Sequence, residues 1–64
     1  SVNLPKDDRQ SVEVLVTVNG REQYRETIET KLQVAVVTLS GSGMQEVTVY
    51  IDGKEDWTKM MDFG

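Results

Sequence analysis

The sequence contains no cysteine, no histidine and a single proline. Without cysteine and histidine, disulfides, thiolate catalysis, histidine-activated nucleophiles and the common zinc sites are all excluded. No apolar run approaches the ~20 residues that a membrane-spanning helix needs. No basic segment followed by an apolar region indicates a signal peptide. If the chain belongs to a membrane protein, we expect its anchor to lie outside these residues.

Lysine and arginine are also scarce, at seven against eleven aspartates and glutamates, which gives a formal net charge of -4. Nucleic-acid binding by counterion release needs clustered cations, so we expect no nucleic-acid partner. The 64 residues are enough for a single domain, residues 1–64, with one thin core. Valine outnumbers leucine and isoleucine, and β-branched residues favour strands, so the composition predicts an all-β fold.

The clearest strand in the pattern runs from Ser11 to Asn19. Every second residue in it is valine, which is the period of a half-buried strand. Asn19 and Gly20 then form a pair that tolerates positive φ, as a two-residue hairpin turn requires. The pattern therefore predicts an antiparallel return strand from Arg21 to Thr30 at the edge of a sheet. A short helix is the alternative there, because Tyr24 and Ile28 are four residues apart.

A second alternating strand lies within the stretch from Ser40 to Lys54. A glycine-rich turn precedes it, and Asp52 with Gly53 forms another hairpin signal after it. The strand directs three apolar side chains to one face and Tyr50 to the other; the three are Val47, Val49 and Ile51. A returning strand is favoured for Lys54 to Phe63. A helical turn is the alternative, given the spacing of Trp57, Met60 and Met61.

The segment from Lys31 to Leu39 is apolar at both parities, which predicts a central strand covered on two sides. Val2 to Leu4 is interpreted as a short edge strand that Pro5 ends, followed by a charged loop from Lys6 to Arg9. Together these elements predict a small antiparallel β-sandwich, Ig-like, with five or six strands. A single five-stranded meander is the alternative.

Carboxylates are the only acid and base groups left for chemistry. Asp56 with Asp62, or Glu26 with Glu29, could in principle act as an acid and base pair. Such chemistry needs a cleft, and so thin a domain has little interior to line one. The paired carboxylates of Asp7 and Asp8 lack the further oxygen ligands of a calcium loop, and residues 40–43 do not match a phosphate-binding loop. We expect no enzyme activity, no metal site and no cofactor.

Three aromatic residues are the candidates for ligand or partner binding: Tyr50, Trp57 and Tyr24. Tyr50 stands out because Val49 and Ile51 take the opposite face. An exposed tyrosine on a sheet could stack on a sugar or anchor a partner. The favoured interpretation is that Tyr50 packs across strands and shields the sheet, and that Trp57 is a core or rim anchor.

Four stretches of the chain carry a family resemblance. They are Leu4-Pro5, VEVLVTVNG from Val12 to Gly20, SGSGMQEVTVYIDGK from Ser40 to Lys54, and the closing Met61-Asp62-Phe63. Together they resemble the membrane-distal C-terminal domain that follows PASTA repeats in receptor-like Ser/Thr protein kinases of Gram-positive bacteria. The resemblance implies an extracellular Ig-like sandwich, tethered through the parent chain at the end of a stalk whose kinase domain is cytoplasmic.

The resemblance also implies a function and partners. PASTA repeats in that family are associated with peptidoglycan fragments and β-lactams, so peptidoglycan fragments or a neighbouring PASTA repeat are the expected partners. No site residue carries over, and the kinase motifs are absent from this chain. The expected function is that of a non-catalytic sensor or spacer facing the cell wall. A structural or adhesive Ig-like repeat of a bacterial surface protein is the alternative, and an intracellular or phage-encoded interaction domain is a third.

Overall fold

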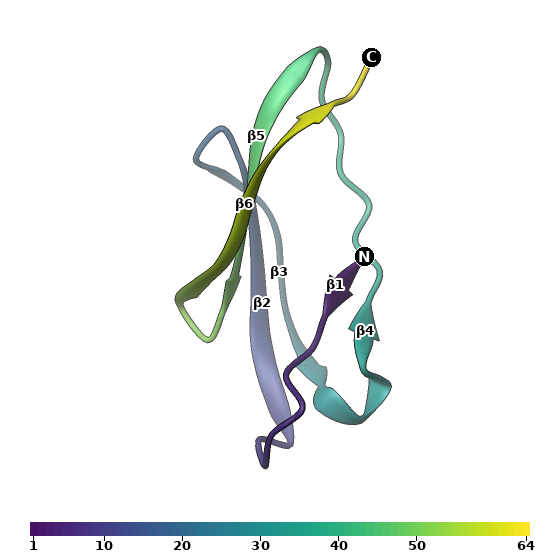
Figure 1. Ribbon diagram of the computed structural model, residues 1–64, viewed down its shortest axis with the longest axis vertical. Helices are drawn as coiled ribbons and strands as arrows, with labels where there is room; N and C mark the ends of the chain where they lie inside the picture. The colour runs from purple at the N-terminus through teal and green to yellow at the C-terminus, as the bar shows by residue number, and fades with distance from the viewer.

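The computed structural model describes all 64 residues, which form six strands and one short 3-10 turn joined by loops and turns. The strands are β1 (Val2–Asn3), β2 (Ser11–Val18), β3 (Arg21–Glu29), β4 (Val34–Ala35), β5 (Met44–Ile51) and β6 (Lys54–Asp62), and the 3-10 turn η1 is Thr30–Leu32. Figure 1 shows two layers, with β2, β3, β5 and β6 on one side and the short strands β1 and β4 on the other. The predicted small antiparallel β-sandwich is therefore confirmed.

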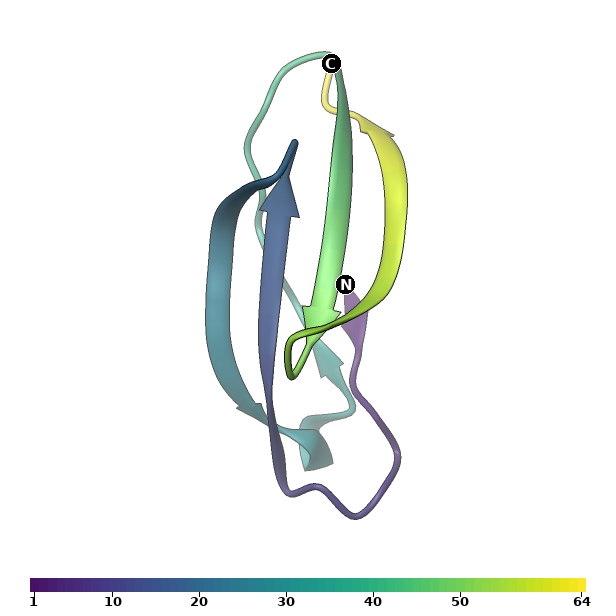
Figure 2. The ribbon, with the colours of Figure 1, turned by 90° about the vertical axis from the view of Figure 1, so that its left-hand side faces the viewer.

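The larger layer is a four-stranded antiparallel sheet with the order β3-β2-β5-β6 (Figure 2). Two hairpins form its halves, and the central strands β2 and β5 join them. Asn19 and Gly20 have φ of 49° and 78°, and Asp52 and Gly53 have 49° and 79°. Positive φ at both positions of a two-residue turn matches the right-handed twist of the flanking strands. Both predicted hairpin turns are confirmed.

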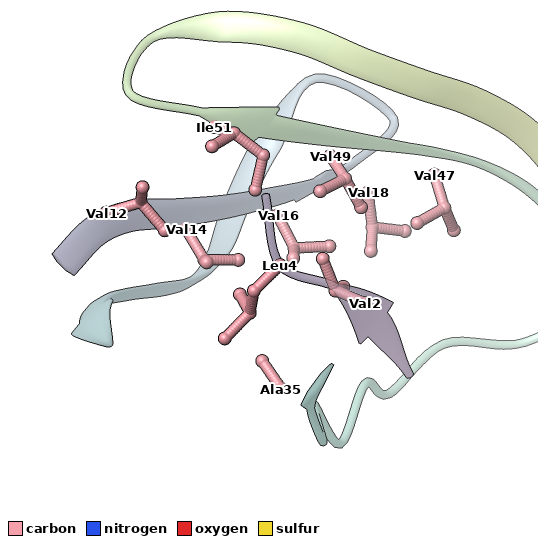
Figure 3. Close-up of a cluster of buried hydrophobic side chains, with 10 residues drawn as sticks. All are labelled: Val2, Leu4, Val12, Val14, Val16, Val18, Ala35, Val47, Val49 and Ile51. Carbon is pink, nitrogen blue, oxygen red and sulfur yellow. The ribbon is translucent and has the colours of Figure 1, made fainter. Parts of the chain in front are cut away.

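The core lies between the two layers (Figure 3). The large sheet contributes a row of alternate residues from each central strand, and the segments of the small layer contribute the buried Val2, Leu4 and Ala35. The half-buried Val37 and Leu39, which follow β4, pack against this core. The large-sheet residues are Val12, Val14, Val16, Val18, Val47, Val49 and Ile51. Valine suits this position because its two γ-carbons fit the pleated surface with a stiff χ1 angle. The alternation in the sequence thus fixed which face of β2 and β5 is buried.

The expectation of a central strand from Lys31 to Leu39 is wrong. The chain makes the turn η1, reverses at Gln33 with φ 68°, and forms only the two-residue strand β4. Its one strand partner is β1, which is also two residues long because Pro5 follows closely. The side of this segment that faces away from the large sheet is therefore uncovered, and Val36 is 82% exposed.

The helical alternatives are also decided by the structure. Arg21–Glu29 is an edge strand paired only with β2, and Lys54–Asp62 is the opposite edge strand, paired only with β5. The pairing of each edge strand contains one register shift: the β2–β3 pairing shifts between Val16 and Thr17, and the β5–β6 pairing shifts between Val49 and Tyr50. The hairpin turns impose these strands, because each turn returns the chain alongside its own preceding strand.

We expect Val14→Ala to lower the free energy of unfolding by about 2 to 3 kcal/mol, because the side chain is fully buried between the layers and truncation leaves a cavity. Urea unfolding followed by circular dichroism measures the change. Val36→Ala is the matched control and should change stability little, since Val36 is largely exposed. Equal losses in the two variants would contradict the arrangement of the layers.

Candidate functional site

Tyr50 lies on the outer face of the large sheet, which the small layer does not cover. It is directly opposite Leu15 on β2 and Glu55 on β6. Tyr50 and Leu15 are both half-buried, and the next row of the same face holds the buried Thr17 and Thr48. The register places Tyr50 beside Leu15, as a residue that packs across strands requires. The Tyr50 side chain is still partly exposed to solvent.

Tyr24 and Trp57 lie on the inner face, at opposite edges of the sheet. The register places both in one row across the strands, in the order Tyr24, Val16, Val49, Trp57. Three strand spacings separate the two rings, or ~14 Å. Both are half-buried against the core, and the Lys59 ammonium lies 4.5 Å from the centre of the Trp57 ring. The three aromatic candidates therefore do not form one site, because Tyr50 is on the other face.

Sequence reasoning missed an ionic cluster centred on Arg9. Its guanidinium contacts Asp7 at 2.8 Å and Asp52 at 2.9 Å, and Asp52 also accepts a hydrogen bond from the Glu13 N–H at 2.8 Å. The Glu13 N–H lowers the pKa of the Asp52 carboxyl most, followed by Arg9. Hydrogen bonds from Arg9 lower the pKa of Asp7. The cluster joins the charged loop after β1 to the turn between β5 and β6, two segments distant in sequence.

A second ionic cluster lies on the outer face and is centred on Arg25. Its guanidinium contacts Glu13 on β2 and Glu22 on its own strand, both at 2.9 Å. The side-chain hydrogen bond from Arg25 lowers the pKa of Glu22. All three side chains are substantially exposed to solvent. These contacts align β3 on β2, and as exposed pairs each adds little stability.

The candidate acid and base pairs are not brought together. Asp56 and Asp62 lie six residues apart on one strand, which separates them by ~20 Å. Glu26 shares the inner face with Tyr24, whereas Glu29 is opposite Ser11 on the outer face and contacts Lys31 at 3.0 Å. The two carboxyls of a glycosidase lie ~5 to 9.5 Å apart across the scissile bond. No group of three or more acidic side chains is placed to hold a metal ion.

The glycine-rich loop before β5 is held by amide side chains. The side-chain amide of Gln23 donates to the Ser40 carbonyl at 2.7 Å and accepts from the Ser40 N–H at 3.1 Å. It therefore satisfies both backbone groups of Ser40, as a neighbouring strand would do. Gln45 donates to the carbonyl of Ser42 and accepts from Asn19. At the other end, Gly43 exchanges backbone hydrogen bonds with Phe63 and Gly64 at 2.9 and 2.8 Å. These contacts give the loop a structural role.

An apolar groove runs between the edge strand β3 and the short strand β4. Tyr24 and Ile28 form its floor on β3, and Leu32, Val34 and Val36 line it from the other side. Leu32 is 61% exposed and Val34 is 41% exposed. The sequence did not predict this groove, because the pattern from Lys31 to Leu39 indicated a strand covered on both sides. The one feature of the sequence that could have indicated this apolar groove is that no charged residue occurs from Leu32 to Gln45.

Comparison with known proteins adds no identification. No family model, no curated protein and no solved structure matches the chain. No helix in the structure is both long enough and apolar enough to cross a membrane.

We expect the Arg9 cluster to make stability depend on acid pH. A carboxyl whose pKa is lower in the folded than in the unfolded protein stabilises the fold above the unfolded-state pKa, and this stabilisation is lost as the pH falls through the folded-state pKa. Stability from Asp7 and Asp52 should therefore be constant from neutral pH to about pH 5 and decline below about pH 4.

The variant Asp52→Asn isolates this effect. Thermal melts between pH 7 and pH 2 should show a lower midpoint than wild type at neutral pH, with the difference shrinking as the acid form of Asp52 is reached. Asp56→Asn is the control, because Asp56 is exposed and its side chain makes no hydrogen bond or ion pair. A constant difference between Asp52→Asn and wild type across this range would contradict the expectation.

Proposed function

We propose that this domain is a non-catalytic extracytoplasmic module of a bacterial membrane Ser/Thr protein kinase, where it serves as a sensor or spacer facing the cell wall. The observation that carries the proposal is the run from Ser40 to Lys54 and its resemblance to the domain that follows PASTA repeats. This run forms the glycine loop, β5 and the second hairpin turn. β5 is one of the two central strands of the large sheet.

The use of the charged residues supports a non-catalytic role. Arg9 and Arg25 are each engaged by two carboxylates. Three of the acidic side chains have lowered pKa values, namely Asp7, Glu22 and Asp52. A general acid that works near neutral pH needs a raised pKa. These carboxylates are suited to tying segments together instead.

The outer face supports the sensor version of the proposal. Tyr50 is the only aromatic residue on that face, and Leu15, Thr48 and Thr58 surround it with apolar and hydroxyl groups. An aromatic ring with hydroxyl neighbours on a flat surface suits shallow contact with a sugar, as in a peptidoglycan fragment. Trp57 is less suited, because the Lys59 ammonium lies over its ring.

The parent gene tests the kinase assignment directly. An upstream kinase domain, a membrane span and PASTA repeats are the expected neighbours of this sequence. Tandem copies of the domain followed by a wall-sorting signal would overturn the proposal and establish the adhesive alternative. A parent chain with no secretion or membrane segment would overturn it in favour of an interaction domain inside the cell.

We expect a soluble muropeptide to shift the NMR amide signals of β2 and β5 around Tyr50. The shift should disappear in Tyr50→Ala and persist in Tyr24→Ala, because Tyr24 lies on the other face of the sheet. Circular dichroism checks that both variants fold. Unchanged wild-type spectra at millimolar muropeptide would remove the sensor role and leave the spacer role alone.

A further inference from the structure

The free edge of β3 carries unpaired backbone groups. The Thr30 N–H donates to the Gln10 carbonyl at 3.0 Å, in the same register that pairs Val12 with Ile28. Backbone groups in an antiparallel ladder alternate between the two sides of a strand. Even-numbered residues in this part of β3 therefore bond to β2, and residues 25, 27 and 29 direct their N–H and C=O groups away from the sheet.

Exposed apolar side chains adjoin this edge. The groove described above lies directly beside β3, with Leu32 and Val36 exposed by 61% and 82%. An open edge next to uncovered apolar surface is a template for pairing with another strand. Figure 2 places β3 at the outside of the large sheet, so a further strand can approach it from the side.

The geometry points to a symmetric dimer in which β3 pairs antiparallel with β3 of a second copy, with Thr27 opposite Thr27 at the two-fold axis. If the two-fold axis is perpendicular to the sheet, the inner faces of both copies lie on the same side. The two four-stranded sheets then form one eight-stranded sheet, and the two apolar grooves adjoin on its inner face. The free N–H and C=O groups of Arg25, Thr27 and Glu29 then pair with Glu29, Thr27 and Arg25 of the second copy.

Charge selects this register. Two-fold registers centred on Arg25, Glu26 or Glu29 would place like charges directly opposite each other, which is destabilising. The register centred on Ile28 places Thr27 opposite Glu29 and joins no opposite charges. The register centred on Thr27 places Arg25 opposite Glu29 of the second copy, and symmetry makes this pair twice. On the inner face Glu26 meets Ile28 of the second copy, at the exposed rim of the groove.

The opposite edge of the sheet lacks this complementarity. Self-pairing of β6 centred on Lys59 places two ammonium groups together, and self-pairing centred on Met60 places Thr58 opposite Asp62, without any ion pair. Registers centred on Trp57 or Thr58 would align Glu55 with Lys59 or Lys54 with Asp62. The register shift near Tyr50 places the two members of each of these pairs on opposite faces of the sheet, so they cannot meet. The dimer is therefore assigned to β3. This association does not depend on the proposed function, and its test uses only the isolated domain.

Sedimentation equilibrium over a concentration series tests the dimer. We expect wild type to show a reversible monomer–dimer equilibrium, and Glu29→Arg to weaken it on the order of tenfold, because two attractive pairs become repulsive. Glu29→Gln, which removes the attraction without adding repulsion, should weaken it less than Glu29→Arg. Glu55→Arg makes the same charge change on β6 and should leave the equilibrium unchanged. A wild type that is monomeric at every concentration would overturn the proposal.

Cross-linking tests the register. The Cα atoms of a hydrogen-bonded antiparallel pair lie ~5.5 Å apart, within reach of a disulfide. The chain has no other cysteine, so Thr27→Cys should oxidise to a covalent dimer that keeps the wild-type circular dichroism. Met60→Cys should remain reduced or cross-link only slowly. Efficient cross-linking through residue 60 and not residue 27 would assign the contact to β6 and overturn the proposal.

Discussion

The packing of the valine rows of β2 and β5 on a very small second layer is the constraint on which the rest of the structure depends. Five of these side chains are the largest fully buried ones in the protein, namely Val12, Val14, Val16, Val47 and Val49. From the other side, the buried side chains that cover them are Val2, Leu4 and Ala35, and the half-buried Val37 and Leu39 also pack against this core. A domain of this size buries a smaller share of its chain than a larger one, so few contacts hold the two layers together.

The narrow cover has consequences at both edges of the large sheet. β1 and β4 are too short to extend over β3 and β6, so Tyr24 and Trp57 close the two ends of the central row as half-buried rings. Beside Tyr24 the closure is incomplete, and the apolar groove remains. Because the small layer does not cover the edges of the large sheet, Tyr24 and Trp57 are held there by packing. For the same reason, apolar surface lies next to the unpaired edge of β3.

Polar side-chain contacts fix segments that a larger hydrophobic core would hold in a bigger domain. Arg9 joins the first loop to the last hairpin turn, Arg25 holds β3 on β2, and Gln23 fastens the glycine loop. Each contact is exposed and weak by itself, but together they fix segments that have few apolar neighbours. The side chains of Arg9, Arg25 and Gln23 are thus engaged in structural contacts.

The sequence by itself determined the strands of the large sheet, because alternation at period two and hairpin turns act between neighbouring residues. It also determined which side of β5 receives Tyr50. Only the tertiary structure decided that Lys31 to Leu39 is mostly unpaired, since its strand depends on a distant and very short partner at Val2–Asn3. It also decided that Arg9 meets Asp52 and that Tyr50 is remote from Tyr24 and Trp57, because such relations arise from strand order, which local patterns do not encode.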